Sequence, residues 1–262
     1  MSRAKSLLAL LFVGIVIALV FLPRERNPGD DATIAESISV SGYTSDGSLL
    51  WDLRAQDGRL DGPDQTLHEV TLDFYGEDSS AMSIRGDRLE RAEASSRLSG
   101  NIRIEREDDL LLEVESLTWN EVDEKLSSGP IALTSEDLCV SAAQFVYDLE
   151  TETASFSGDV EAIAKLETDW AIQADRAEEQ GGVVVFRGAI RAASEDSESF
   201  RCTSLKIETE TKVAYLSGDV VGEWPSGQLS AESVRWNEDG VHAIGRVEAR
   251  LDLEELRKSN DP

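Results

Sequence analysis

The sequence is poor in the residues that most catalytic and metal sites use. Two histidines, His68 and His242, and two cysteines, Cys139 and Cys202, occur among 262 residues. The histidines lie far apart and share no spacing of the HExxH type that holds zinc. The sequence also lacks a GxSxG nucleophile elbow, a Walker loop and a GxGxxG loop. We therefore expect no metal, no cofactor and no enzyme activity.

Positive charge is also scarce. Lys and Arg together number 25 against 52 Asp and Glu, which gives a net charge of −27. Nucleic acid and anionic membrane surfaces both need a basic face, so neither fits the folded part of the chain. Only six of the basic residues are Lys. A lysine-poor, acidic surface suits a high-salt habitat, and it equally suits an ordinary solvated β-surface.

No segment after residue 23 shows a convincing helical apolar period. Instead a short phrase recurs, which reads apolar, polar, Gly, polar, β-branched. Its glycines lie at 100, 129, 158, 188, 218 and 245, so successive copies are 27 to 30 residues apart. A period in this range is typical of a repeat fold in which each unit contacts its neighbours. We expect these glycines on the inward face, where their small size keeps an interior trough open.

A second phrase precedes each glycine and reads apolar-x-small-x-x-apolar-x-bulky. One copy is Leu112, Val114, Leu117 and Trp119, and an earlier copy has Arg91 in the bulky position. Period-two alternation predicts a half-buried strand. The step of three after the small residue shifts the phase, as a β-bulge or bend does. Each repeat is therefore predicted to be a strand, a turn, a bent strand and another turn.

The same phase places the two cysteines. Cys202 fills the small position of its strand and should face the apolar side, whereas Cys139 precedes Val140 and should face outward. The two also lie two repeats apart. Because a disulfide needs Cα atoms within about 7 Å, we expect both thiols to be free.

The N-terminal region contains one long apolar run, residues 7–22. As a helix it would be about 24 Å long, slightly shorter than the roughly 30 Å hydrocarbon core of a bilayer. A cleaved signal peptide is the alternative, but the run ends in Val20-Phe21-Leu22-Pro23 without an A-x-A-like site. We therefore favour an uncleaved anchor with the N-terminus in the cytoplasm. Its anchoring side chains would include Leu7, Leu11, Phe12, Ile15, Leu19 and Leu22.

The ordered combination of these features resembles the LptC family of inner-membrane proteins in the lipopolysaccharide transport bridge. The resemblance is carried by the anchor, Gly47-x-x-x-Trp51-x-Leu53-x-Ala55, Val70-x-Leu72-x-Phe74-Tyr75 and Leu98-x-Gly100-x-Ile102. Later units are similar to the related LptA/OstA repeat, notably Ala142 through Tyr147 to Phe156-x-Gly158-x-Val160. The resemblance covers roughly residues 1–250. One departure is length, because a minimal LptC domain would end near residue 150 to 190.

The resemblance implies an all-β fold, an elongated V-shaped β-jellyroll or β-taco of stacked antiparallel strands after a single transmembrane helix. It implies a cytoplasmic N-terminus (1–6), the anchor (7–22), a linker (23–36), an LptC-like β domain (37–120), further OstA/LptA-like repeats continuous with it (121–253) and a polar tail (254–262). The downstream domain would then be periplasmic.

The resemblance also implies a non-enzymatic function. The anchor would contact the membrane subunits of an ABC exporter, and lipopolysaccharide acyl chains would pass along an apolar groove. An LptA/OstA-type protein would receive them by edge-strand pairing. The expected groove residues are apolar or aromatic: Trp51, Leu53, Leu72, Phe74, Ile84, Ile102, Ile104, Leu117, Trp119, Phe145, Tyr147, Phe156, Val160, Ile190, Leu205, Val220, Val234 and Trp236.

Residue patterns alone leave two alternatives open. The apolar rows, which we expect to include Val247 at their far end, could pack on themselves as a dry core. The protein would then be an anchored scaffold that binds only protein partners. A glycan-active β-helix enzyme is the second alternative. It would need a line of acidic or basic residues on one exposed face over several consecutive repeats, and the sequence shows no such line.

Overall fold

The structure is a computed structural model that describes residues 33–43, 47–61, 64–75, 80–92, 94–106, 110–120, 122–165, 168–237 and 240–251. The expected membrane anchor and polar tail lie outside these residues, as does most of the linker. Within the described ranges, no helix is long and apolar enough to cross a membrane.

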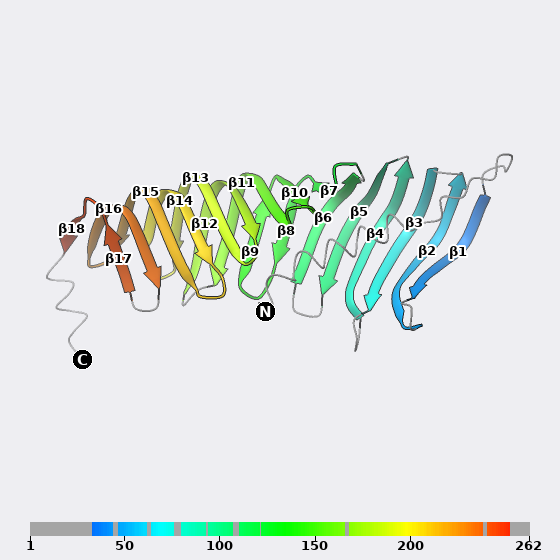
Figure 1. Ribbon diagram of the computed structural model, residues 1–262, viewed down its shortest axis with the longest axis horizontal. Helices are drawn as coiled ribbons and strands as arrows, with labels where there is room; N and C mark the ends of the chain where they lie inside the picture. The colour runs from blue at the N-terminus through cyan, green and yellow to red at the C-terminus, as the bar shows by residue number, and fades with distance from the viewer. Residues whose placement is uncertain are drawn as a thin grey trace. The chain divides into compact units, whose positions relative to one another are not determined.

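The described residues form eighteen strands, β1 to β18, and the pairings defined between them are antiparallel (Figure 1). This confirms the all-β, antiparallel part of the predicted fold. The arrangement is jellyroll-like within each of two compact units. One unit, here the N-terminal unit, comprises Lys5–Glu136 and Gln144–Ala154. The other, the C-terminal unit, comprises Asp137–Ala143 and Ser155–Pro262, with Met1–Ala4.

In the N-terminal unit, β1 to β6 form a series in which each strand pairs with the next. The strands are β1 (Thr33–Tyr43), β2 (Leu49–Asp61), β3 (Asp64–Tyr75), β4 (Ser80–Ala92), β5 (Ser95–Arg106), β6 (Leu110–Asn120), β7 (Lys125–Ser128), β8 (Ile131–Thr134) and β10 (Gln144–Asp148). Both β7 and β8 pair with β6, so together they occupy the position of one long strand. The interruption falls at Gly129-Pro130, where proline supplies no N–H for a ladder.

In the C-terminal unit, β12 to β16 form the corresponding series. Its strands are β9 (Leu138–Ala142), β11 (Thr153–Lys165, from Ser155 on), β12 (Asp169–Gln180), β13 (Val183–Ser194), β14 (Ser199–Glu208), β15 (Val213–Trp224), β16 (Gly227–Asn237), β17 (Gly240–Ile244) and β18 (Glu248–Leu251). The last two strands both pair with β16.

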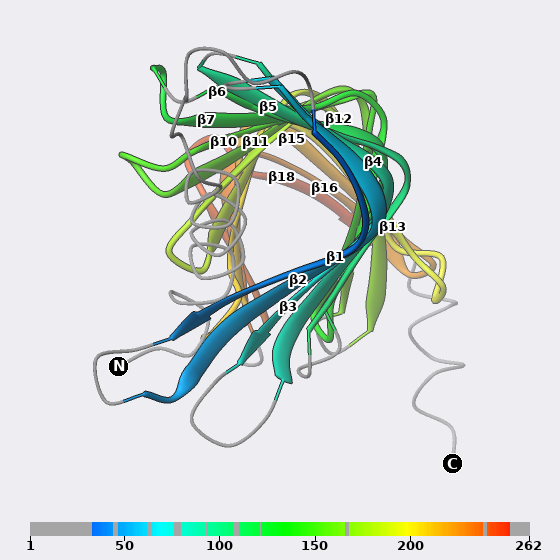
Figure 2. The same ribbon diagram turned by 90° about the vertical axis from the view of Figure 1, so that its right-hand side faces the viewer.

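The long strands bend near their middle, and the curvature is visible in Figure 2. Each bend coincides with a register shift, for example Ser99/Ile102 in β5 and Ser217/Val220 in β15. In β5 the two residues Gly100-Asn101 lie opposite the single residue Glu115 of β6, which is the pattern of a β-bulge. The predicted step in the second phrase on β6 therefore lies opposite a bulge, and the extra residue belongs to the glycine phrase on β5.

Three of the repeated glycines, Gly100, Gly188 and Gly218, lie at these register shifts and do not line the interior. Gly100 and Gly218 have φ of +79° and +80°, and the following Asn101 and Asp219 are also left-handed. A Cβ on Gly100 would meet the exposed side chain of Asp87. The expectation that these glycines lie on the inward face is therefore wrong. The left-handed backbone at the bulge turns the glycine outward, while the apolar residues on either side stay inside.

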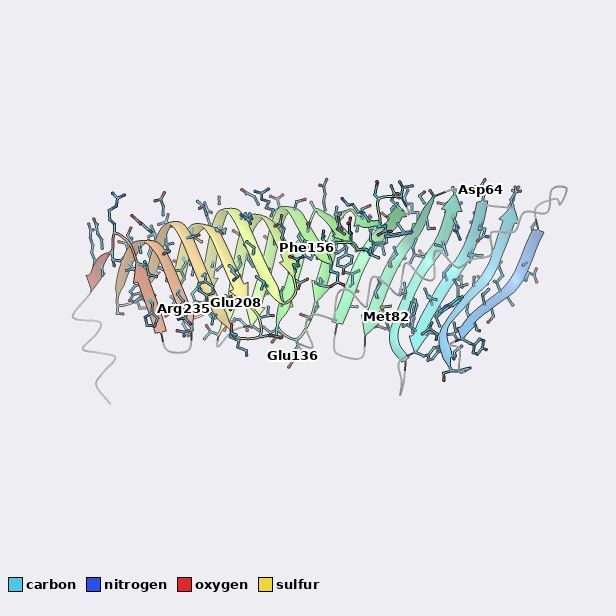
Figure 3. The ribbon with its side chains drawn as sticks, viewed as in Figure 1. Asp64, Met82, Glu136, Phe156, Glu208 and Arg235 are labelled. Carbon is cyan, nitrogen blue, oxygen red and sulfur yellow. The ribbon has the colours of Figure 1, made fainter. Side chains whose placement is uncertain are left out.

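Away from the bulges, burial alternates along each strand. In β12, for example, Trp170, Ile172 and Ala174 are buried and the residues between them are exposed. Met82 and Phe156, labelled in Figure 3, lie on the buried side, whereas Asp64 and Glu136 are exposed. We call the side that carries the buried residues the inner face of each unit. This alternation follows from the period of two in strand geometry.

Candidate functional site

The inner face holds nearly all of the residues that the sequence assigned to an apolar groove. All but two of these eighteen side chains are buried, with exposed fractions of 7% or less. The two exceptions, Phe74 and Trp236, are half-buried, and both lie close to the ends of their strands. Burial places these residues on the inner face. It does not test whether they contact lipid.

In the N-terminal unit, the inner face forms continuous cross-strand rows. One row links Leu53, Leu72, Ile84, Ile104, Leu112 and Leu133 through direct register partners on β2, β3, β4, β5, β6 and β8. A second row links Leu67, Leu89, Leu98 and Leu117. Each of these side chains is at most 6% exposed. Such rows remove apolar area from water, and each Å² buried stabilises the fold by about 25 cal/mol.

The C-terminal unit has an equivalent row, which runs through Ala177, Phe186, Leu205, Leu216 and Val234 on β12 to β16. In addition, three aromatic rings contact one another there. Trp170 lies 4.5 Å from Trp236 in an edge arrangement and 5.5 Å from Phe200, and Phe200 lies 5.9 Å from Trp236 (ring centroids). We call these three residues the aromatic cluster.

The aromatic cluster joins the two halves of the bent strands. Trp170 and Phe200 precede the bulges of β12 and β14, whereas Trp236 follows the bulge of β16. Their ring contacts therefore span the interior of the C-terminal unit from one half to the other. Ring pairs at these distances are worth about 0.5–1.5 kcal/mol beyond the area that they bury. The cluster closes the interior at this point.

Polar side chains interrupt the inner face at the ends of three adjacent strands of the N-terminal unit. Gln65, Arg91 and Ser96 are 7, 4 and 1% exposed, and they occur on β3, β4 and β5 as successive register partners. Ser96 in turn pairs with Trp119 of β6, which is 2% exposed. A charged side chain is seldom buried to this extent, because removing it from water is costly.

The C-terminal unit carries one half-buried acid at a related position. Glu179 occupies the bulky position of its repeat near the end of β12, and its carboxylate accepts a hydrogen bond from the backbone N–H of Gly182 at 3.0 Å. Burial raises the pKa of this carboxyl, and the Gly182 hydrogen bond opposes the shift. The sequence shows both exceptions, Arg91 and Glu179, because each replaces an apolar residue in the repeat.

The outer face is polar and carries exposed ion pairs. Arg54 pairs with Asp52 and Asp73, Arg201 with Glu223 at 3.2 Å, and Lys206 with Glu208 at 2.7 Å. The Lys206 hydrogen bond lowers the pKa of Glu208. Exposed pairs of this kind contribute little to stability, because water and salt screen them. The outer face is therefore polar, and the large apolar side chains lie mostly on the inner face.

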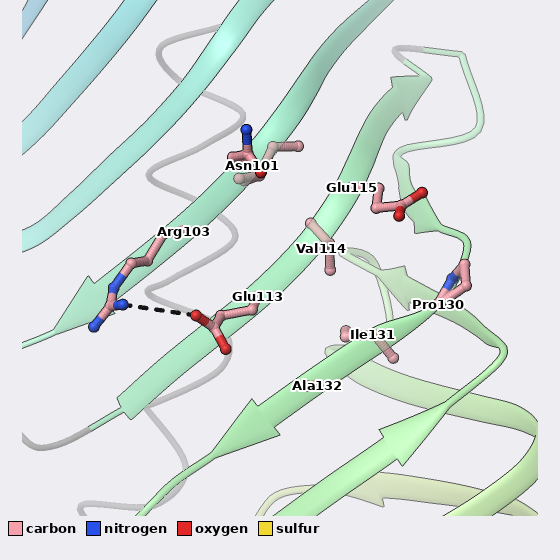
Figure 4. A pocket seen from close by; sticks show the side chains of 9 residues that line it. Asn101, Arg103, Glu113, Val114, Glu115, Pro130, Ile131 and Ala132 are labelled. Atoms are coloured by element: carbon pink, nitrogen blue, oxygen red, sulfur yellow. Dashed lines mark ion pairs between the residues drawn. The ribbon is translucent and has the colours of Figure 1, made fainter.

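A surface depression of about 510 Å³ lies where β5, β6 and β8 meet (Figure 4). Its rim includes Asn101, Glu115 and Pro130, and the ion pair between Arg103 and Glu113 at 3.6 Å. Backbone pairing between β6 and β8 continues at Glu113–Ala132 and Val114–Ile131 beneath it. The depression lies next to the broken strand, and its lining also includes the buried inner-face residues Ile102, Val114 and Ile131.

Apolar side chains become exposed at the first and last strands of the series. Ile34 and Tyr43 of β1 are 80 and 64% exposed, and Val241 of β17 is 46% exposed. Val247 was expected to continue an inner row, but it is 47% exposed and this expectation is wrong. The chain leaves the sheet between β17 and β18, so no cross-strand partner covers Val247.

The two cysteines can be compared with the positions that their strands predicted. Both thiols are free, and Cys202 is buried on the inner face as predicted. Burial raises the pKa of its thiol to about 11. Cys139, which was expected to face outward, is half-buried. In the part of the chain that the structure describes, His, Cys, Asp and Glu side chains form no group that could hold a metal ion.

Sequence reasoning missed three residues of the inner face that matter for its chemistry. Ser96 and Gln65 are small or flexible polar residues in strand ends, and the period-two pattern alone gives no reason to single them out. Phe200 fits the apolar position of its strand in the repeat, but that pattern does not place it in an aromatic cluster. Contacts between the two halves of bent strands depend on curvature, which a repeat pattern does not encode.

Comparison with known proteins gives no independent assignment. No protein-family model matches the chain, and no curated protein matches it.

Proposed function

We propose that this protein is a non-enzymatic, membrane-anchored component of the lipopolysaccharide transport bridge. In this proposal the inner face accepts the acyl chains of lipopolysaccharide from an ABC exporter. The chains then pass along the cross-strand rows toward an LptA/OstA-type partner. The site of action is the periplasm, with the N-terminus of the chain in the cytoplasm.

The observation that carries the proposal is the inner face itself. Bent strands place an apolar side within each unit, and its rows run across successive strands, in the direction in which a conduit would extend. Acyl chains suit such a surface, because each buried CH₂ contributes about 0.8 kcal/mol. The apolar run at residues 7–22 and the motif resemblance to the LptC family support the same assignment. The resemblance also implies the finer architecture that we propose, a V-shaped β-taco.

Edge strands supply a means of pairing with partners. The first strand β1 pairs with β2, and its outer side carries no pairing defined among the described residues. Unpaired strand edges add strands from other proteins readily. The exposed Ile34 and Tyr43 would gain burial on such pairing. The extra repeats beyond a minimal LptC domain would lengthen the bridge.

A photocrosslinking amino acid tests the proposal in cells that are exporting lipopolysaccharide. Phe145 and Val146 are neighbours on β10, and they are 1 and 37% exposed. A crosslinker at Phe145 should capture lipopolysaccharide, and so should one at Leu117. The matched position Val146, on the outer face, should capture little. Absence of lipid adducts at both inner positions would count against the proposal.

A protein-binding scaffold remains the second candidate, and the aromatic cluster favours it. Ring contacts across the interior and exposed fractions of 0–7% describe a well-packed core. For a conduit, these contacts must separate when a chain enters. The crosslinking result distinguishes the two candidates. In a dry core, a crosslinker at an inner position reacts with neighbouring side chains and captures no lipid.

A further inference from the structure

Buried hydrogen-bond donors gather at one end of the inner face in the N-terminal unit. Register partners run from Arg91 on β4 to Ser96 on β5 and to Trp119 on β6. The three side chains are at most 4% exposed. We call these three residues the donor row. Adjacent strands lie about 4.8 Å apart, so the three side chains are close neighbours on one face.

Two members of the donor row lack a hydrogen-bond partner. The Oγ of Ser96 and the Nε1 of Trp119 are buried and find none among the described residues. An indole N–H can only donate, and a hydroxyl can donate as well as accept. Leaving a buried donor without an acceptor costs about 1–3 kcal/mol. The guanidinium of Arg91 adds a fixed positive charge and five N–H donors beside them.

The apolar surface begins directly beside the donor row. Leu89, Leu98 and Leu117 lie two residues further along the same three strands, toward the bulges, and are themselves register partners. Two residues along a strand correspond to about 6.8 Å. The inner face therefore changes from donors at the strand ends to aliphatic side chains near the bend. That order matches an amphiphile with a polar head and an apolar tail.

The C-terminal unit supplies a natural contrast. Trp170 and Ser194 are register partners on β12 and β13, and their Nε1 and Oγ atoms are likewise buried without a partner. The neighbours of Trp170 are the rings of Phe200 and Trp236, where the donor row of the N-terminal unit has Arg91. A Ser–Trp pair thus occurs in both units, but a buried guanidinium accompanies only the pair formed by Ser96 and Trp119 in the described residues.

We propose that the donor row recognises the phosphate group of an anionic amphiphile whose chain lies on the adjacent leucines. This proposal rests on the proposed function and adds to it the position and chemistry of the head group. Arg binds phosphate through two parallel N–H bonds, and Ser96 and Trp119 supply two more donors. A phosphate monoester has enough terminal oxygens to accept all four. Burial then strengthens each charge-assisted bond.

The test uses the full chain in nanodiscs made of galactolipid, which contains no phosphate. The probes are decyl phosphate, decyl maltoside and inorganic phosphate, and binding is followed by tryptophan fluorescence and by the ³¹P line width. We expect decyl phosphate to bind at least about tenfold more tightly than decyl maltoside. Arg91→Met should remove this preference, and Ser96→Ala and Trp119→Phe should each reduce it about threefold to tenfold.

Matched variants in the other unit control for loss of a buried Ser–Trp pair. Trp170→Phe and Ser194→Ala should leave the phosphate preference unchanged. Ser96→Ala removes a single oxygen and Trp119→Phe keeps an aromatic ring, so they test the site even if Arg91→Met impairs folding, which circular dichroism would reveal. Arg91→Lys keeps the charge and should retain part of the preference.

Other results would overturn the proposal. If both decyl probes bound equally well, and no variant changed this, the inner face would bind acyl chains but would have no phosphate site. The two orphan donors would then hold water only. Inorganic phosphate that binds as tightly as decyl phosphate would indicate a free-anion site and not an amphiphile site. Binding of neither decyl probe would instead contradict the proposed function itself.

Discussion

The two units use the same bent strands but differ in what lies at the strand ends. In the N-terminal unit the inner face ends in a buried guanidinium and two orphan donors, Arg91, Ser96 and Trp119. In the C-terminal unit the aromatic cluster joins the two halves of the strands across the interior. Both units carry a buried Ser–Trp pair, so the difference lies in Arg91, which gives the N-terminal unit a charge that suits an anionic head, and in the aromatic cluster of the C-terminal unit.

This difference shows how one repeat can carry two tasks. Apolar positions near the bulges are the same in both units, because they build the core that each bent strand needs. Positions at the strand ends are free of that demand and can vary, as Arg91, Trp119, Glu179 and Trp236 do. Variation at the bulky position of the repeat is therefore the place to look for function. The following predictions test this contrast, from the largest expected effect to the smallest.

The aromatic cluster should be the most costly feature to remove. Phe200 is 4% exposed and contacts both Trp170 and Trp236. Phe200→Ala should lower the free energy of unfolding by about 3–5 kcal/mol, since it leaves a cavity and loses ring contacts. Urea denaturation monitored by fluorescence measures this. Tyr215→Ala removes a 36% exposed ring from the same unit and should cost far less. Equal costs would mean that the cluster is not a packed core.

Burial should make the thiol of Cys202 much less reactive than an ordinary exposed thiol. Burial raises the pKa of Cys202 from an ordinary value of 9.0 to about 11, so at pH 8 its thiolate fraction falls by about two powers of ten. Alkylation of the native protein followed by peptide mass spectrometry should label the half-buried Cys139 well before Cys202. Rapid labelling of Cys202 would show that the interior of the C-terminal unit opens to water.

The bulge glycines should be far more sensitive than the glycine at the broken strand. Gly100 is left-handed, and a Cβ there would approach the side chain of Asp87 within 2.3 Å. Gly100→Ala should therefore destabilise by about 1–2 kcal/mol or more. Gly129 is not left-handed, and a Cβ there would meet nothing within 4 Å. Gly129→Ala should be nearly neutral in the same denaturation experiment, and an equal loss in both would contradict the bulge.

Glu179 should give the smallest effect, seen in the pH dependence of stability. Burial raises the pKa of this carboxyl above its ordinary value of 4.5. The folded state therefore keeps the proton at pH values where the unfolded chain has lost it, and stability falls as the pH rises through that window. Glu179→Gln should flatten this fall when the free energy of unfolding is measured between pH 4 and 7. An unchanged slope would show that the carboxylate is well solvated.

Much of the fold could be predicted from the sequence, because it depends on local patterns. Period-two alternation marked the strands, and the step of three between Val114 and Leu117 marked the bulge. The inner face followed from the same phase, as Leu117 and Phe145 illustrate. The direction of the glycines could not be derived, since the phase of a strand does not carry through a left-handed residue. Gly100 was therefore assigned to the wrong side.

The chemistry of the strand ends was harder to predict. Arg91 was visible as a polar residue in a bulky position, but its neighbours Ser96 and Trp119 join it only through the register of three strands. The aromatic cluster depends on curvature that brings Trp170 of β12 against Trp236 of β16. Both features are long-range consequences of sheet geometry. Neither leaves a contiguous signal in the sequence.

The most direct test of the central claim is a scan of photocrosslinkers at successive positions of one strand in each unit. Residues 144–148 on β10 alternate between exposed and buried, and residues 213–217 on β15 include the buried Leu216 beside the exposed Tyr215. In exporting cells, lipopolysaccharide adducts should appear with a period of two, at Phe145, Tyr147 and Leu216. Adducts at none of these positions, or equally at Val146 and Tyr215, would contradict a lipid-bearing inner face.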